Sequence, residues 1–400
     1  MKNIAITSVL LLVCLSCQKP GSTAVEYVDA NGETIPKIML DLIEDEAEVK
    51  FTDWFENIRM IELETTENSL MRHLMRTYVG EEYIIVSTAD HGILQFSASG
   101  KFVRVLAAQG GGPGEVMDAN RNIFVDEKND KLYTTDGQLH RDKALCVGIN
   151  SGEITYIPFR NTGGESHVRD IIVLNDSLMY CTTMQVRGSP STCPVFCQTT
   201  SGRLLWEMNK THPKGITNGQ IRLVDGEIYF RYLFGGDTIF RLEEDELLPV
   251  ITSWSDHPSA YEKQEIGSVY TGLYLMTKNL FKGGISRITD VVVDERSGRA
   301  RPTISDSEEI VFNQKTGQVH KIGSIKNDYL GFNDPFYLQI LPNRKGVARY
   351  EAVDFYEKVD SMYHLPDIAK NLKSRLGTIL ETLDENDNHW LLVGELKKGL

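Results

Sequence analysis

The sequence predicts an all-β protein: a six-bladed β-propeller of four-stranded antiparallel blades, with a small helical insertion before the last strand. Three observations carry this prediction. A turn motif returns about every 50 residues, short β-rich segments lie between its copies, and helical periodicity appears only near the C-terminus. Repeats of about 50 residues that each hold about four short strands are typical of propellers, and roughly 300 residues at this period accommodate six blades.

The recurring turn consists of a hydroxyl residue, a glycine and a polar residue, followed by a short alternating run. The hydroxyl and glycine pair favours a tight turn with positive φ, and the run after it reads as a half-exposed strand. The first three glycines are 52 and 50 residues apart, and the gap before the fourth leaves room for two further units, one ending near 245–248. The four copies are Ser99-Gly100-Lys101, Ser151-Gly152-Glu153, Ser201-Gly202-Arg203 and Thr316-Gly317-Gln318.

Short segments between these turns are rich in β-branched and aromatic residues, as strands are. Asn, Asp and Gly separate them, which indicates turns. The predicted strands include 83–86, 122–126, 131–134, 170–174, 227–230 and 289–293.

The C-terminal region changes period. Residues 349–361 and 367–383 are predicted as helices, because apolar residues of the second segment recur at spacings of three and four on one face. Residues 389–396 read as a closing strand. Propellers avoid an open sheet edge when strands from both chain ends share one blade, so we expect 58–64 to pair with this strand. The propeller is predicted to span 51–400.

The N-terminus has the pattern of a bacterial lipoprotein signal. Lys2 precedes an apolar run over 4–15, and Ser16 precedes Cys17. The run is shorter than the roughly 20 residues that span a bilayer, so 1–16 are expected to be a removed signal peptide. The resemblance implies that Cys17 becomes lipidated and anchors the chain. An ordinary secretory signal with an incidental cysteine is the alternative.

After the signal, residues 17–50 are predicted to be a lipidated tether and acidic spacer, with an acidic run over 41–48. Cys17 is followed by no acidic residue until Glu26. This favours an anchor in the outer membrane that faces the periplasm, and thus a protein of the cell envelope.

Composition restricts the partners. The formal net charge is −14, and an acidic surface repels phosphate backbones, so no nucleic-acid partner is expected. Four cysteines remain if Cys14 leaves with the signal and Cys17 is lipidated. Buried free thiols are the favoured interpretation, and a cross-strand contact between Cys181 and Cys197 is the alternative.

A family resemblance rests on two stretches. Residues 55–66 resemble the "I-x-x-I-x-L-E-T-T" opening of the six-bladed β-propeller lipoproteins of Gram-negative bacterial envelopes. Residues 99–104, followed by Gly-Gly-Gly-Pro-Gly-Glu at 110–115, are similar to that family's "G-K-F-x-x-x-x-G-x-x-G-x-G-P-G-E". The resemblance covers about residues 50–400. It implies the propeller fold and the envelope location, and no settled enzymatic activity.

The glycine-rich stretch 110–115 is the most conspicuous loop. A phosphate-binding loop needs a following helix and a lysine, and a predicted strand follows here instead, so a link between blades is favoured. Such links border the central channel. Glu115 and Arg121 are therefore candidates for ligand contact, and a structural ion pair or turn contact is the alternative for both.

The sequence contains no Gly-x-Ser-x-Gly elbow and no His-Glu-x-x-His, and no two histidines are three or four apart. No catalytic residue, metal ligand or cofactor is predicted. We expect a non-catalytic binding or scaffolding module for a glycan, a peptide or an envelope protein. The alternative is a calcium-dependent, lactonase-like hydrolase that uses the channel, with oxygens from Asn122, Asp136, Asn175 and Asp290.

Overall fold

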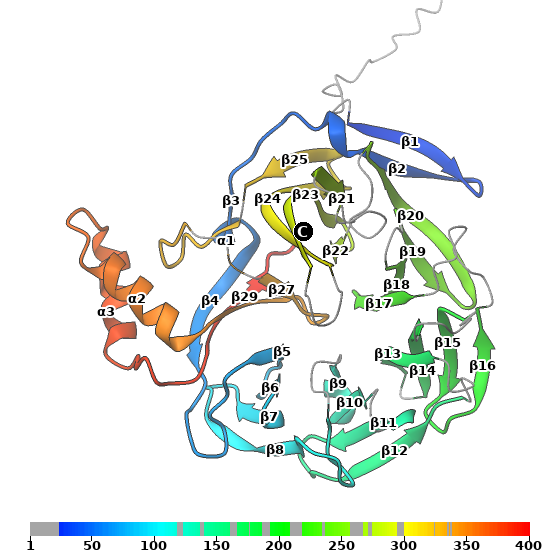
Figure 1. Cartoon of the computed structure of the whole chain (residues 1–400), viewed down its shortest axis with the longest axis horizontal. Coiled ribbons are helices and arrows are strands. Elements are labelled where there is room, and N and C mark those ends of the chain that lie inside the picture. Colours follow the sequence, from blue (N-terminus) through cyan, green and yellow to red (C-terminus); the bar gives the residue numbers. More distant parts are fainter. Residues whose placement is uncertain are drawn as a thin grey trace, which may run out of the picture.

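Six antiparallel sheets surround a central axis and form a six-bladed β-propeller (Figure 1), which confirms the predicted fold class. The computed structural model describes residues 24–117, 123–136, 140–160, 166–175, 177–185, 193–208, 218–233, 237–256, 267–270, 274–293, 300–323, 325–333, 336 and 338–400.

The first three blades each have four strands, which follow the chain from the axis outward. Blade 1 holds β5 (Leu74–Val79), β6 (Tyr83–Thr88), β7 (Gly92–Ser97) and β8 (Phe102–Ala108). Blade 2 holds β9 (Ile123–Asp126), β10 (Lys131–Asp136), β11 (His140–Gly148) and β12 (Ile154–Pro158). Blade 3 holds β13 (Ser166–Leu174), β14 (Leu178–Gln185), β15 (Val195–Thr199) and β16 (Leu204–Glu207).

The other three blades are built on the same four-stranded plan, with an extra strand in blade 5 and a strand from the N-terminal side of the chain in blade 6. Blade 4 holds β17 (Gly219–Val224), β18 (Glu227–Tyr232), β19 (Thr238–Glu243) and β20 (Glu246–Trp254). In blade 5, β21 (Gly267–Tyr270) and β22 (Tyr274–Thr277) both pair with β23 (Leu280–Val293), followed by β24 (Ala300–Asn313) and β25 (Gln318–Ile322). Blade 6 holds β27 (Leu338–Ile340), β28 (Lys345–Tyr350), β29 (Trp390–Leu396) and β4 (Phe55–Glu62).

Strands from the two ends of the chain close the ring in blade 6. β4 is the outermost strand of this blade and pairs antiparallel with β29, with Met60 opposite Leu392. Leu391 and Leu392 are fully buried between sheet faces. The pairing expected between 58–64 and the last strand is therefore present, and it leaves no gap between the first and the last blade.

The recurring Ser/Thr-Gly turn has one place in the architecture: it precedes the outermost strand of a blade. Gly100, Gly152, Gly202 and Gly317 all have positive φ and lead into β8, β12, β16 and β25. In blade 4 the same position is taken by Glu244, with φ 50°, before β20. Blade 6 needs no such turn, because its outermost strand comes from the N-terminal side of the chain.

These turns also dock each blade onto the preceding one. A Cβ atom at Gly100 would lie 1.8 Å from the carbonyl oxygen of Glu62 in β4, and one at Gly202 would lie 2.7 Å from the ring of Pro158 in β12. From β8, Arg104 donates to the carbonyl oxygens of Ile149 and Asn150 in the next blade. Glycine is thus required both by the backbone conformation and by the close approach of a neighbouring blade.

The segment before the propeller differs from the predicted tether. It forms β1 (Val25–Ala30), β2 (Glu33–Met39), the 3-10 helix η1 (Leu40–Leu42) and β3 (Val49–Lys50). β2 adds to blade 4 in parallel with β20, and β3 pairs with β26 (Ile325–Lys326) after blade 5. Ile38, Leu40 and Ile43 are buried. The acidic run concealed these apolar residues, whose burial covers two sheet edges that would otherwise be open.

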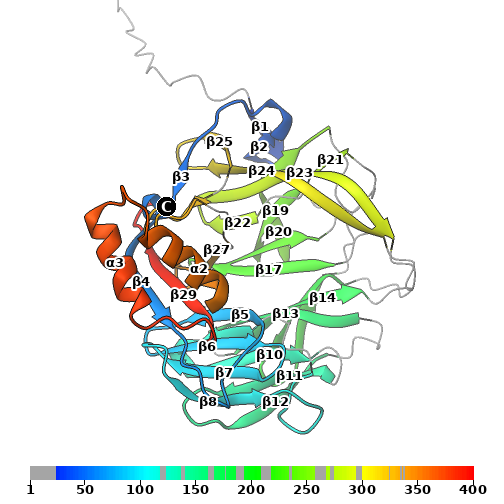
Figure 2. The same ribbon diagram turned by 60° about the vertical axis from the view of Figure 1, so that its left-hand side comes forward.

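The helices near the C-terminus form a hairpin outside the ring, packed on blade 6 (Figure 2). They are α2 (Ala352–Tyr363) and α3 (Lys370–Leu380). α2 begins later than predicted because Arg349 and Tyr350 pair with β29, and α3 is shorter at both ends than the predicted 367–383. A short helix α1 (Phe51–Trp54) and the 3-10 helix η2 (Glu127–Asn129) were not expected. The described helices are too short or too polar to serve as membrane spans.

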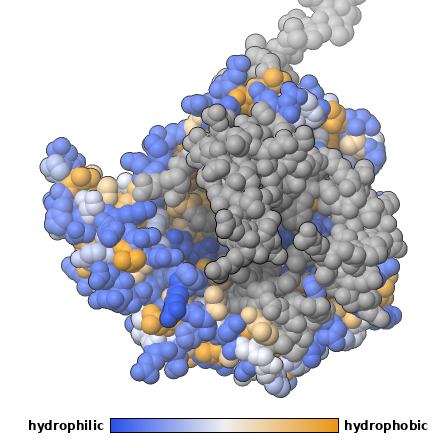
Figure 3. Space-filling model, viewed as in Figure 1, coloured by the Kyte–Doolittle hydropathy of each residue, from blue (hydrophilic) through white to orange (hydrophobic). Residues whose placement is uncertain are grey.

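Apolar side chains fill the space between adjacent blades. One cluster joins Phe96 of blade 1, Leu145 of blade 2 and Leu391 of blade 6. Cys146, Cys181, Cys193 and Cys197 are buried free thiols, as favoured from the sequence. Cys181 lies opposite Phe196 and Cys197 opposite Tyr180, so this cysteine pair is not directly opposed. On the face shown in Figure 3, the described surface around the ring is mostly hydrophilic.

We expect truncation after Asn388, which removes β29, to abolish cooperative unfolding, because it exposes the edges of β4 and β28 together with apolar blade faces. The milder Leu391→Ala should lower the free energy of unfolding by about 2–5 kcal/mol, and the exposed Lys398→Ala should leave it unchanged. Thermal and urea unfolding followed by circular dichroism measures both. A truncated chain that melts at the full-length temperature would contradict ring closure by β29.

Candidate functional site

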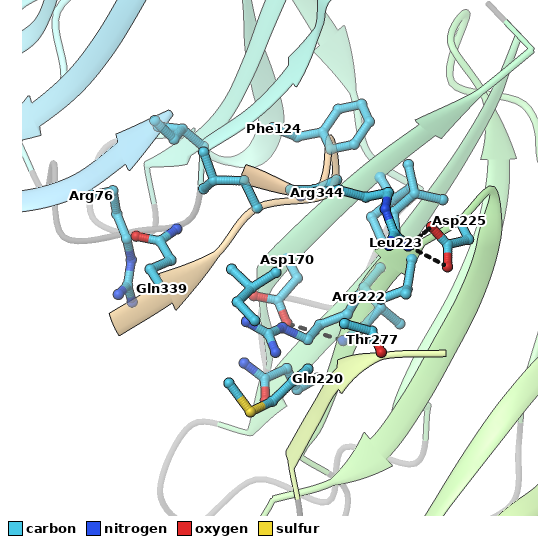
Figure 4. A pocket seen from close by; sticks show the side chains of 18 of the residues that line it. Arg76, Phe124, Asp170, Gln220, Arg222, Leu223, Asp225, Thr277, Gln339 and Arg344 are labelled. Atoms are coloured by element: carbon cyan, nitrogen blue, oxygen red, sulfur yellow. Dashed lines mark hydrogen bonds and ion pairs between the residues drawn. The ribbon is translucent and has the colours of Figure 1, made fainter. Parts of the chain in front are cut away.

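A cavity of about 210 Å³ lies at the centre of the ring, and all six blades contribute to it (Figure 4). Most of its lining comes from the innermost strands, whose residues meet here although they are far apart in the sequence. The polar and charged side chains of the lining are Arg76, Asp170, Gln220, Arg222, Asp225, Thr277, Gln339 and Arg344.

Arg76 and Gln339 lie on one side of the cavity in Figure 4, on β5 of blade 1 and β27 of blade 6. Arg76 is half-buried. Its Nε–H is shielded from solvent and finds no hydrogen-bond partner among the described residues. A shielded donor without a partner costs free energy in the folded state, and the hydrogen-bonding capacity of this group is unused among the described residues.

Asp170 lies on β13 of blade 3 and is almost fully buried at 2% exposure. Its carboxylate accepts hydrogen bonds from the Thr182 hydroxyl at 3.0 Å and from the backbone N–H of Ile221 in blade 4 at 3.3 Å. The Nε atom of Arg169 lies 3.8 Å away. Burial raises the pKa of the Asp170 carboxyl, and these neighbours partly oppose the shift. Asp170 therefore joins blade 3 to blade 4 beside the cavity.

Gln220 and Arg222 follow on β17, two residues apart and thus on the same side of the strand. The Gln220 carbonyl oxygen accepts a hydrogen bond from Arg231 Nε at 2.8 Å, which leaves its NH₂ group as the donor toward other partners. Arg222 donates to the carbonyl oxygen of Leu275 on β22 and so joins blade 4 to blade 5.

Arg344 and Asp225 form an ion pair at one end of the cavity. The distances from Arg344 Nη1 to the two carboxylate oxygens are 3.1 and 3.3 Å. Arg344 belongs to the turn between β27 and β28, and Asp225 to the turn between β17 and β18. The pair therefore connects blade 6 with blade 4 across the turns of the inner strands.

The described charged residues of the lining are three arginines and two aspartates, so their formal charge is +1 in a chain whose net charge is −14. The described groups supply many hydrogen-bond donors, and both carboxylates already accept hydrogen bonds or an ion pair. This arrangement is suited to binding an acceptor-rich ligand.

Glu115 was predicted to contact a ligand, and its carboxylate instead accepts a hydrogen bond from the backbone N–H of Gly112 in its own loop. A Cβ atom at Gly110 would lie 2.2 Å from this carboxylate. The same loop contacts the outer strand β12, where Tyr156 accepts a hydrogen bond from Gly114 N–H. The observed contacts match the structural alternative, and ligand contact by Glu115 stays a prediction.

Cys17 and Arg121 lie outside the described residues, as does Asn122. The side chains of Asp136 and Asp290 are likewise not described. Asn175 is exposed in the turn between β13 and β14, with φ 51°. Among the described residues, no group of three or more His, Cys, Asp or Glu side chains is arranged to hold a metal ion.

The cavity residues were missed at the sequence level because they come from six separate repeats. One signal was present: Asp170 begins the predicted strand 170–174, in which residues 171–174 are apolar. A charged residue within an otherwise apolar strand needs a buried partner, and here it marks the cavity wall.

The fold and the cavity define a β-propeller protein with a polar central cavity. A family model described as a domain of unknown function, DUF4934, matches residues 36–395, and the chain belongs to this family.

Two solved structures from Bacteroides are similar. A Bacteroides fragilis protein described as exported has 15% sequence identity and a TM-score of 0.60, over 88% of this chain and 98% of that one. A DUF4221 family member from Bacteroides vulgatus has 10% identity and a TM-score of 0.48, over 86% and 97%. At these identities only the first similarity carries an argument, and that argument concerns the fold. A search of curated proteins found no match.

We expect Asp170→Ala to lower the free energy of unfolding by about 1–3 kcal/mol, because the buried Ile221 N–H loses its acceptor. Asp170→Asn keeps an oxygen acceptor and removes a buried charge. Since burial raises the pKa of Asp170 in the folded state, its ionised form costs stability at high pH. The asparagine variant should therefore be at least as stable as the wild type in urea unfolding at pH 8. Equal losses of unfolding free energy in Asp170→Ala and Asp170→Asn would show that the negative charge of Asp170 is needed for stability.

Proposed function

We propose that this protein is a non-catalytic binding or scaffolding module of the bacterial cell envelope, with the central cavity as its ligand site. The ligand is a glycan, a peptide or a segment of a protein partner. The observation that carries the proposal is the cavity itself, which all six blades line and to which five of them contribute polar side chains, with the shielded Arg76 Nε–H on one side.

Binding is favoured over catalysis by the state of the polar groups in the cavity. Asp170 is held by Thr182 and Ile221, and Asp225 is paired with Arg344. A general acid or base has to reach the proton that it transfers, and these carboxylates are committed to contacts within the ring. These carboxylates and their partners therefore hold the cavity lining in one arrangement before a ligand binds.

The envelope location is supported by the Ser16-Cys17 pattern and by the similarity to a protein described as exported. A lipid anchor at Cys17 in the outer membrane, facing the periplasm, is part of this proposal. Ala24 is fully buried in the body, and Cys17 precedes it by seven residues in the sequence. At about 3.5 Å per residue the segment between them spans no more than about 25 Å. The propeller is thereby held close to the membrane surface.

The anchor predicts that the wild-type protein, expressed in a Gram-negative host, enters the detergent phase in a cloud-point partition, and that Cys17→Ala stays in the aqueous phase. The reason is the loss of the acyl chains, which supply the membrane affinity. Cys14→Ala is the matched control and should partition as the wild type does. Equal partition of the wild type and Cys17→Ala would remove the anchor from the proposal.

The binding function predicts that the anchored protein, isolated from its own envelope under mild detergent, retains a specific partner or glycan. A sample in which Arg76 and Gln339 are both replaced by alanine should retain less of it. The calcium-dependent alternative is tested on the same samples by thermal unfolding with calcium and with a chelator. The binding proposal expects equal melting temperatures, whereas a bound calcium ion would raise the melting temperature by mass action.

A further inference from the structure

We infer that the central cavity selects a small ligand with a single carboxylate group, of the size of one sugar acid, and that Arg76 binds this carboxylate. The inference rests on the proposed binding function and adds the chemical class of the ligand. It is argued from the charges of the lining, from the direction of its hydrogen-bond donors and from its size.

Among the described arginines of the lining, Arg76 is the one whose guanidinium keeps a buried N–H without a hydrogen-bond partner among the described residues. Arg344 is neutralised by Asp225 at 3.1 Å. Arg222 donates to a backbone carbonyl of the next blade. Asp170 is bonded by Thr182 and Ile221, and Arg169 lies beside it at 3.8 Å. The charge of Arg76 also acts on this carboxylate. The Arg76 Nε–H has no partner within the described chain.

The formal charge of +1 in the lining matches a ligand with one negative charge. A monocarboxylate neutralises it. A phosphate monoester, with a charge near −2 at neutral pH, would leave excess negative charge in a confined site, which is costly. The guanidinium group also has the planar fork that fits a carboxylate with two parallel hydrogen bonds.

Two neutral amide side chains supply further hydrogen-bond donors in the cavity lining. Gln220 presents its NH₂ group, because Arg231 holds its oxygen. Gln339 lies beside Arg76 in Figure 4 and faces Asp170, Arg222 and Gln220 across the cavity. Amide groups of this kind suit the hydroxyl and ring oxygens of a sugar, whereas they give little to an apolar acid.

The volume of about 210 Å³ corresponds to about seven water molecules at ~30 Å³ each. One sugar ring with its substituents is of this order, so the cavity holds about one such unit. The ligand is thus a free sugar acid or a single acidic residue at the end of a chain. Both sources share the carboxylate and the hydroxyl groups.

The test compares glucuronate with glucose, which differ only in the oxidation of C6, by calorimetric titration into the intact wild-type protein. Glucuronate should bind and raise the melting temperature, and glucose should bind at least about tenfold more weakly, since it lacks the charge-assisted hydrogen bonds. Glucose 6-phosphate tests the phosphate alternative and should also bind more weakly. Methyl β-glucuronide, compared with free glucuronate, distinguishes a chain end from a free acid.

Arg76→Gln should weaken glucuronate binding by about tenfold or more. Arg76→Lys keeps the charge without the fork and should retain part of the affinity. Arg203→Gln is the matched control, since Arg203 is exposed in a turn far from the cavity lining, and it should bind as the wild type does. The wild-type comparison of glucuronate with glucose stands even if a variant fails to fold.

Four outcomes would overturn the inference. Equal binding of glucose and glucuronate would show a sugar site without carboxylate selection, and the proposed binding function would remain. Tighter binding of glucose 6-phosphate would assign the cavity to phosphate. Normal glucuronate binding by an Arg76→Gln protein that melts earlier would make Arg76 a structural partner of Asp170. If none of these probes binds while the envelope partner is still retained, the carboxylate inference fails alone; loss of both would end the binding function as well.

Discussion

The pairing of β4 with β29 is the interaction on which the rest of the structure depends. It places the two ends of the propeller in one sheet and prevents blades 1 and 6 from separating. An open ring would expose the edges of two strands and the apolar faces between blades. It would also release the inner strands from their common axis, and the cavity would no longer exist. Ring closure is therefore a condition for the binding site as well as for stability.

Polar side chains join neighbouring blades near this axis and around the ring. Arg104 joins blade 1 to blade 2, Asp170 blade 3 to blade 4, and Arg222 blade 4 to blade 5. Arg349 on β28 joins blade 6 to blade 1, since it donates to the carbonyl oxygens of Leu74 and Met75. Two of these residues also line the cavity. The contacts that hold the blades together thus also fix the side chains of the cavity lining before a ligand binds.

The repeat motif predicted the architecture well because the Ser/Thr-Gly turn has a strict local requirement. Gly100, Gly152, Gly202 and Gly317 need positive φ, and the preceding blade leaves no room for a side chain at Gly100 or Gly202. Blades 4 and 6 lack a copy of this turn motif. In blade 4 Glu244 adopts the positive φ at the same position, and in blade 6 the outermost strand β4 comes from the N-terminal side of the chain. The segment over 25–50 was read incorrectly, because charge dominates its composition. Its few apolar residues become buried only in the folded chain, where β2 pairs with β20 and β3 pairs with β26 after blade 5.

The sequence by itself determined the class of fold, the number of blades, the presence of late helices and the pairing of the chain ends. These features follow from local patterns: alternation along strands, helical spacing and glycine turns. Only the tertiary structure decided which side chains share the cavity. Arg76, Asp170, Gln220 and Gln339 belong to four blades and have no common spacing. Their convergence is a consequence of closing six sheets around one axis, a constraint that acts between repeats and leaves no pattern within any one of them.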